Sequence, residues 1–269
     1  MTKRGIILTN NPGLGAAAVA DIALYLLLAT FRFTSVLEHA LRTERQLFQS
    51  RNVLNTDRFI KGVPKRGEKD GLAFGDNVAG KSVTCPTGKR CGIVGMGAIG
   101  KEIARRAVAF GMSVHFYTRT PLSNETLATL PVSSMIAYSS LQDLLPNCDV
   151  IVLCVPLGAH THHILNTKTL ALLPKGARVV NVGRGGLIDT EALVAALDSG
   201  HLTSAGLDVF EGEPEIPKIL LDRWDVTILP HIGSSTLESV VTAEDAIMRN
   251  IENVVLEGGC GITPVNCIK

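Results

Sequence analysis

A glycine motif typical of dinucleotide binding lies near the middle of the chain. Gly95, Gly97 and Gly100 form a G-x-G-x-x-G pattern that follows a predicted strand and opens a predicted helix. In this motif the first glycine permits a tight turn, the second lets the backbone approach a pyrophosphate, and the third lets helix and strand pack closely. The helix N-terminus, with Ala98 and Ile99 in its first turn, supplies N–H groups for the phosphates. This context favours a nucleotide site over a purely structural turn.

The strand after this motif bears on the choice of cofactor. It ends in Tyr117, Thr118, Arg119 and Thr120, and no acid appears before Glu125. An NAD site usually has an acid here that accepts hydrogen bonds from the ribose hydroxyls. Arg119 and Thr120 would instead offer hydrogen bonds to a 2′-phosphate, although Arg119 could equally be an ordinary surface arginine. The sequence therefore favours NADP, with NAD as the alternative.

Three histidines invite comparison with metal ligands. His160, His162 and His163 form an H-x-H-H pattern after a predicted strand, but no acid or cysteine close in the sequence completes a ligand set. We therefore expect no metal there. His115 lies within a predicted strand and is expected in the core.

Alternating strands and helices must position these residues. Apolar runs of strand length, covered on both faces, are predicted for Cys91–Gly95, Val114–Tyr117, Val150–Val155, Arg178–Val182, Ala205–Val209 and Thr227–Leu229. Helices are predicted over Ile99–Phe110, which ends at Gly111, and over Asp189–Asp198, which stops at Gly200. This alternation predicts an α/β fold with a doubly wound parallel sheet of the Rossmann type. Residues 34–90 look polar and irregular, and residues 61–71 are expected to form a surface loop.

Composition limits the remaining classes. The chain has 269 residues, of which 46% are hydrophobic, and 26 basic residues against 25 acidic ones give a net charge of +1. It can bury a full core, and its balanced charge favours neither nucleic acid nor an anionic membrane as a partner. The apolar stretch from Gly15 to Phe33 contains Asp21 and many alanines, which suits a buried helix better than a membrane span.

Six cysteines without a C-x-x-C pair are expected to be reduced thiols, and no signal peptide opens the chain. A soluble cytoplasmic protein is expected.

Beyond the glycine motif, the sequence resembles the D-isomer-specific 2-hydroxyacid dehydrogenases along nearly its whole length. The specific blocks are VNVGRGGLID at residues 180–189, GLDVFEGEP at residues 206–214 and LPHIGSST at residues 229–236. The end of the second strand is similar to the NADP-preferring glyoxylate and hydroxypyruvate reductases of that family. The formate dehydrogenase branch fits poorly, because it usually carries Gln at the position of Glu213.

The resemblance implies a catalytic trio of Arg184, Glu213 and His231. Arg184 would hold the substrate carboxylate and polarise the 2-oxo group. His231, as imidazolium, would donate a proton to the carbonyl oxygen as hydride arrives from the nicotinamide. Glu213 would hydrogen-bond the other ring nitrogen and favour the charged imidazole.

The resemblance also implies cofactor contacts outside the glycine motif. Asp208 matches the residue that contacts the nicotinamide amide, and Val155 and Pro156 match the turn beside the cofactor. Val182 and Gly233, in the matched blocks, are also expected to bind the cofactor. The helix predicted at Asp21–Phe31 is apolar on most faces, so it belongs either to the core or to a subunit interface. The resemblance favours the interface, because these enzymes usually dimerise through this region, and a homodimer is expected.

The main departure from the family is at the N-terminus, since the chain starts near the point where family members enter the nucleotide-binding domain. Residues 13–236 are therefore expected to form the dinucleotide-binding domain, and residues 1–12 and 237–269 a remnant of the substrate-binding domain. The sequence is compatible with two alternative functions. The first is NADPH-dependent reduction of a 2-oxo acid to a D-2-hydroxy acid. The alternative is a non-catalytic dinucleotide-binding protein that senses cofactor or binds a partner.

Overall fold

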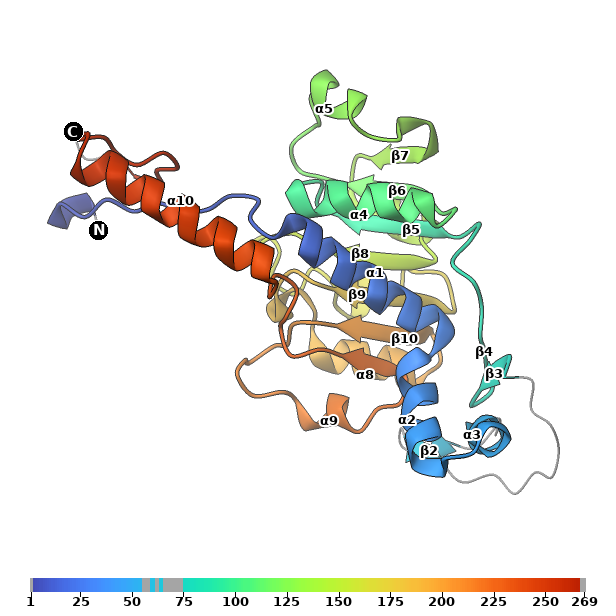
Figure 1. The fold of residues 1–269 in the computed structure, drawn as a ribbon. Coiled ribbons are helices and arrows are strands. Elements are labelled where there is room, and N and C mark those ends of the chain that lie inside the picture. Colours follow the sequence, from blue (N-terminus) through green and yellow to red (C-terminus); the bar gives the residue numbers. More distant parts are fainter. Residues whose placement is uncertain (1, 55–58, 61–62, 65–74, 267–269) are drawn as a thin grey trace.

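A seven-stranded parallel sheet forms the centre of the molecule (Figure 1). The computed structural model describes residues 2–54, 59–60, 63–64 and 75–266. The strand order is β11-β10-β9-β8-β5-β6-β7, and every neighbouring pair is parallel. The strands are β5 (Arg90–Val94), β6 (Ser113–Tyr117), β7 (Met135–Tyr138), β8 (Val150–Leu153), β9 (Ala177–Asn181), β10 (Leu202–Leu207) and β11 (Val226–Ile228). The predicted doubly wound α/β sheet is confirmed.

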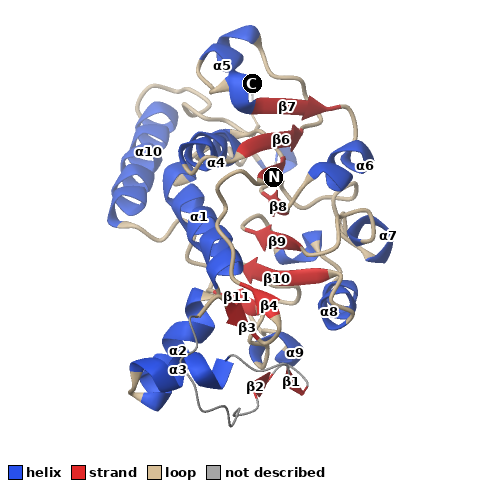
Figure 2. Cartoon of the chain, turned by 90° about the vertical axis from the view of Figure 1, so that its right-hand side faces the viewer, coloured by secondary structure: helices blue, strands red, loops and turns tan. Residues whose placement is uncertain are grey.

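Helices cover both faces of the sheet (Figure 2). On one face α1 (Ala16–Arg32) and α4 (Ala98–Ala109) pack against the strands through one apolar cluster, which includes Leu26 and Ile103. On the other face α6 (Leu141–Leu144), α7 (Thr167–Leu170) and α8 (Thr190–Asp198) contribute to a second cluster. The remaining helices are α2 (Thr34–Glu44), α3 (Leu47–Leu54), α5 (Asn124–Ala128), α9 (Lys218–Leu221), α10 (Leu237–Val255) and the 3₁₀ turns η1 (Thr2–Arg4), η2 (Val132–Ser134), η3 (Leu145–Asn147) and η4 (Gly185–Leu187).

The direction of the strand order reverses between β5 and β8. From β5 the chain continues outward through β6 and β7, whereas β8 begins the run to β11 on the other side. In open α/β sheets, ligands bind outside the carboxyl ends of the strands at such a switch point. The glycine motif follows β5 there, and Val155 and Pro156 follow β8. The topology therefore places the predicted cofactor residues at the edge where a ligand is expected.

The structure corrects two predictions about secondary structure. Residues 34–90 are not irregular throughout, because α2 and α3 pack Val36, Ala40 and Leu54 into a small apolar cluster with Val78. Their few apolar positions gave little sequence signal. Strand β7 was not predicted, because this edge strand exposes its two central residues and lacks a continuous apolar run.

The loop predicted at residues 61–71 lies mostly outside the described residues. Within it, β2 (Val63–Pro64) pairs with β1 (Phe59–Ile60), and further on β3 (Asn77–Val78) pairs with β4 (Lys81–Ser82).

The cysteines correct a third prediction. Cys85, Cys91, Cys148 and Cys154 are free, as expected, but Cys260 is disulfide-bonded. Cys267 lies outside the described residues. Burial raises the pKa of the Cys91 thiol to about 12, so the thiol form is favoured there. His115 is buried as predicted, and its ring hydrogen-bonds the Tyr138 hydroxyl at 2.9 Å.

Among the helices that the structure describes, none is long and apolar enough to cross a membrane alone. Helices α1 and α2 pass such a test only as a pair, with a bend of 69° between them. The stretch from Gly15 to Phe33 is mostly α1, whose apolar side chains face the sheet.

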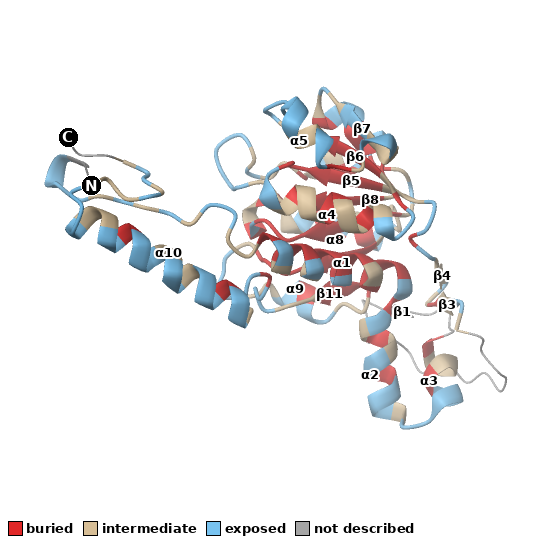
Figure 3. Cartoon of the chain, turned by 45° about the horizontal axis from the view of Figure 1, so that its top comes forward, coloured by how far each residue is buried: buried red, intermediate tan, exposed pale blue. Residues whose placement is uncertain are grey.

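The two terminal segments lie side by side, away from the sheet (Figures 1 and 3). Thr9 forms an antiparallel bridge with Pro264, and the Val265 N–H donates to the Leu8 carbonyl at 2.7 Å. Helix α10 projects from the domain beside them and leaves many apolar side chains exposed (Figure 3). These include Leu237, Val241, Met248 and Val255, and Leu256 just after the helix is exposed as well.

An ion pair fastens the amino ends of β5 and β8 and leads to a first prediction. Asp149 accepts hydrogen bonds from the Arg90 backbone N–H at 2.8 Å and from its guanidinium at 2.9 Å. Burial would raise the pKa of Asp149, but these bonds and the charge of Arg90 outweigh it and lower the pKa. Asp149→Asn should therefore reduce the free energy of unfolding at pH 7 by about 1–3 kcal/mol.

The pH dependence of this loss has a definite sign. Because the folded pKa is depressed, the stabilisation is present above the unfolded carboxyl pKa and disappears as pH falls through the folded value. Urea unfolding should show the gap between wild type and Asp149→Asn closing below about pH 4. A gap that persisted unchanged into stronger acid would contradict this role.

Candidate active site

The glycine motif forms the turn between β5 and α4. Gly95 has a φ of 101°, which favours glycine, and a Cβ on Gly100 would lie 2.0 Å from the Gly95 carbonyl oxygen. Around Gly97, by contrast, no described atom outside this glycine and its two chain neighbours lies within 4 Å of the Cβ position. The turn therefore leaves open space above Gly97, at the N-terminus of α4 that begins with Ala98 and Ile99. These features fit a bound dinucleotide pyrophosphate.

The neighbouring predicted cofactor residues lie at the same edge of the sheet. Val155 contacts the glycine turn, since its Cγ1 lies 2.7 Å from the Cβ position of Gly95. Pro156 follows it, and its carbonyl accepts a hydrogen bond from the Thr161 hydroxyl at 2.7 Å. Arg119 and Thr120 are exposed just beyond the end of β6, and Val182 is buried just beyond the end of β9. The assignment of these residues to the cofactor remains a prediction.

Two of the three predicted catalytic side chains, His231 and Glu213, are hydrogen-bonded to each other. His231 Nδ1 lies 2.9 Å from Glu213 Oε2, although the residues are 18 positions apart. The other Glu213 oxygen accepts the Phe210 N–H at 2.8 Å. Burial would raise the pKa of Glu213, but these two hydrogen bonds and the charges of His231 and Arg184 lower it. Glu213 is thereby held as a carboxylate beside a half-exposed imidazole.

The His231 backbone is held in an uncommon conformation. Its φ of 56° lies in the left-handed region, which non-glycine residues rarely adopt without support. The support comes from Asp208, whose two carboxylate oxygens accept the N–H groups of Ile232 at 2.9 Å and Gly233 at 2.8 Å. Asp208, predicted to contact the nicotinamide, is 2% exposed and fixes the loop that carries His231. That positioning role was missed from the sequence.

Arg184 begins the turn that follows β9. Asn181 shapes this turn, because its side chain accepts the Gly183 N–H at 3.0 Å and donates to the Arg184 carbonyl at 2.9 Å. A Cβ on Gly185 would lie 1.8 Å from the Phe210 carbonyl carbon, so this turn and the Glu213 loop are in direct backbone contact. The fold thus brings the loops of all three predicted catalytic residues together. The Arg184 guanidinium itself donates to the Gly183 carbonyl at 2.7 Å.

Asn181 and Asp208 share a signal that sequence reasoning could have used. Each is a polar residue at or just after the carboxyl end of a largely buried strand, a few positions before a predicted catalytic residue. Buried polar groups in such places need hydrogen-bond partners, and the nearest unpaired groups are the N–H groups of the following turn.

Comparison with known proteins shows which family the chain resembles. Residues 41–233 match the family model described as D-isomer specific 2-hydroxyacid dehydrogenase, NAD binding domain. The chain is 35% identical over 257 residues to 4-methyl-2-oxopentanoate reductase A of Aspergillus oryzae, covering 96% of this chain and 67% of that protein. It is 36% identical over 256 residues to a glyoxylate reductase of Pyrococcus horikoshii, covering 93% and 66%. The chain thus spans about two thirds of the length of both relatives.

Solved structures show the same likeness. The holo form of Rhodotorula graminis D-mandelate dehydrogenase superposes with a TM-score of 0.84 at 36% identity, covering 99% of this chain and 70% of that one. An NADPH-dependent glyoxylate/hydroxypyruvate reductase of Sinorhizobium meliloti, in complex with NADP and malonate, gives a TM-score of 0.77 at 32% identity, covering 98% and 71%.

The fold and the glycine turn define a domain of the class that binds a nicotinamide dinucleotide. Within that class, the chain belongs to the D-isomer-specific 2-hydroxyacid dehydrogenase family.

Proposed function

We propose that the protein reduces a small 2-oxo acid to a D-2-hydroxy acid with NADPH. The observation that carries the proposal is the His231–Glu213 hydrogen bond of 2.9 Å, on loops that meet the Arg184 turn. A proton donor, its orienting carboxylate and a cation for an anionic substrate are the groups that this reduction needs. When bound, the cofactor supplies a hydride to the 2-oxo carbon.

Each residue has a separate task in this proposal. Arg184 binds the substrate carboxylate with its planar guanidinium and polarises the neighbouring carbonyl. His231 donates the proton at its Nε2 to the carbonyl oxygen, because Glu213 already occupies Nδ1. Glu213 stabilises the imidazolium before the transfer and fixes the ring afterwards. Asp208 keeps His231 in place through the N–H groups of Ile232 and Gly233.

The preference for NADP over NAD forms part of the proposal. Arg119, exposed at the end of β6, offers a cation where the ribose 2′-phosphate of NADP is expected. Arg119→Ala should therefore weaken NADPH binding about 10- to 100-fold, the effect of one lost charge-assisted hydrogen bond, and leave NADH binding nearly unchanged. Fluorescence titration with both cofactors measures this. Equal losses for NADPH and NADH would contradict a 2′-phosphate contact.

We also propose the division into domains and the oligomeric state. Residues 13–236 form the dinucleotide-binding domain, and residues 1–12 and 237–269 belong to a second, substrate-binding domain. The pairing of the two terminal segments with each other supports this division. A homodimer is supported by apolar side chains exposed on α2 and α3, namely Leu41, Leu47 and Phe48.

The test of the proposed reaction is NADPH consumption by the purified chain. Suitable substrates are glyoxylate, hydroxypyruvate, phenylglyoxylate and branched-chain 2-oxo acids. Turnover of any of them, with the D-isomer as product, is the expected result. NADPH binding without turnover would support the alternative, a non-catalytic dinucleotide-binding protein.

A further inference from the structure

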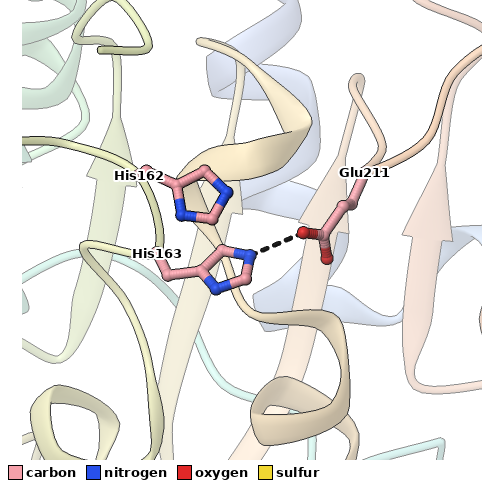
Figure 4. Close-up of side chains that lie close together, drawn as sticks. All are labelled: His162, His163 and Glu211. Carbon is pink, nitrogen blue, oxygen red and sulfur yellow. Dashed lines mark hydrogen bonds and ion pairs between the residues drawn. The ribbon is translucent and has the colours of Figure 1, made fainter. Parts of the chain in front are cut away.

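A second cluster of histidine and glutamate side chains lies outside the predicted catalytic trio (Figure 4). It consists of His162 and His163 on the loop after β8 and of Glu211, two residues before Glu213. One ligand atom from each of the three side chains lies within 4.8 Å of the other two. No acid lies close to these histidines in the sequence, but the fold brings in Glu211 from 48 positions away.

Several contacts hold the cluster together. His163 has a φ of 47°, and its ring stacks on that of His162 with centroids 3.9 Å apart (Figure 4). His163 Nε2 lies 2.5 Å from Glu211 Oε1, and the His163 N–H donates to the Gly186 carbonyl at 2.8 Å. The second Glu211 oxygen accepts the Thr190 hydroxyl at 3.1 Å. Glu211 and His163 are thus fixed from both sides.

His162 differs from the other two members. It is exposed, whereas His163 and Glu211 are half-buried. Its ring lies against the Arg184 turn, with Cδ2 3.7 Å from the Cβ position of Gly186. The cluster therefore has two fixed groups and a third that is free to adjust toward a ligand at the surface.

We propose that His162, His163 and Glu211 bind a divalent transition-metal ion of the zinc class. Two imidazoles and one carboxylate form a donor set that suits Zn²⁺, Co²⁺ and Ni²⁺, with a fourth position left for water. Tetrahedral ligands about 2.1 Å from zinc are about 3.4 Å from one another. The three ligand atoms lie within 4.8 Å of one another, so small movements would bring them to this spacing. The exposed His162 ring would adjust its position, and His163 Nε2 and Glu211 Oε1, now 2.5 Å apart, would move apart.

Metal binding would replace the hydrogen bond between His163 and Glu211. The ion takes the place of the proton between Nε2 and Oε1, and that proton leaves to solvent. The Thr190 hydroxyl would then orient the ligating carboxylate through its free oxygen, as outer-shell groups commonly do. A bound ion would link the loop after β8 to the loop that carries Glu213. This inference goes beyond the proposed reaction and does not depend on it.

The test is a titration of the tag-free, chelator-treated chain with Co²⁺, followed by visible absorption, and with Zn²⁺, followed by calorimetry. One saturable site with the absorption of tetrahedral Co²⁺ is expected. His162→Ala should weaken binding at least about tenfold. This variant removes an exposed side chain and should leave the fold unchanged. Glu211→Gln should weaken binding similarly.

His160→Ala is the matched control, because His160 is exposed on the same loop but lies outside the cluster. It should bind the metal as the wild type does. Absence of a saturable site would overturn the proposal, as would equal weakening by His160→Ala and His162→Ala. Neither the Co²⁺ absorption nor the Zn²⁺ calorimetry measures turnover, so failure of the metal proposal is distinguishable from failure of the proposed reaction.

Discussion

His231→Ala should lower NADPH-dependent turnover of a 2-oxo acid about 10²- to 10⁴-fold, the usual contribution of a positioned general acid. The substitution removes the proton donor at the position where Glu213 orients it at 2.9 Å. The glycine turn and Arg119 are untouched, so the cofactor dissociation constant should stay within about twofold of the wild-type value. Steady-state rates and NADPH fluorescence titration on the same preparation measure the two quantities.

Glu213→Gln should have a smaller effect on turnover than His231→Ala. Glutamine keeps the size of the side chain but loses the charge that favours imidazolium, so the rate should fall by less than in His231→Ala. Pairing the two substitutions should give little further loss, because both act on one proton transfer. Turnover by His231→Ala at more than a tenth of the wild-type rate would show that the proton comes from elsewhere.

The sheet could be predicted from the sequence because its central strands are buried on both faces. Strand β9 illustrates this, with Arg178–Val182 predicted and Ala177–Asn181 observed. Strand β7 was missed at the edge, where two of its four residues face solvent and the apolar run is broken. The helices α2 and α3 were missed for a related reason, since each buries only two residues.

The candidate site was predictable in its residue types but not in its contacts. The matched blocks named Glu213 and His231, yet only the fold brings them within 2.9 Å. The left-handed backbone at His231 has no signal in the sequence, because nothing local marks a histidine for a positive φ. The approach of Glu211 to His163 was likewise invisible, since it depends on two loops from different strands. Residue spacing can therefore predict ligand sets that are close in the sequence. It cannot predict sets whose members come from loops after different strands at one edge of the sheet.

Two glycines of the fingerprint should respond differently to alanine, although they stand three positions apart. Gly97→Ala should leave the free energy of unfolding within about 0.5 kcal/mol of the wild-type value, because its φ of −70° suits alanine and its Cβ would meet no described atom within 4 Å. The same methyl group would occupy the space through which the backbone approaches the pyrophosphate. Cofactor binding should therefore weaken about tenfold or more, equivalent to about 1.4 kcal/mol.

Gly100→Ala should act on stability first. Its Cβ would lie 2.0 Å from the Gly95 carbonyl oxygen and 3.3 Å from Cys154 Sγ, so helix α4 would have to move away from β5. Overpacking of this kind costs about 1–3 kcal/mol and, against backbone, the upper end of that range is expected. Urea unfolding and NADPH titration of both variants separate the two roles. Equal destabilisation by both substitutions would indicate that the motif serves only as a tight turn. Weaker cofactor binding by a fully stable Gly97→Ala variant would indicate that the dinucleotide binds in the open space above Gly97.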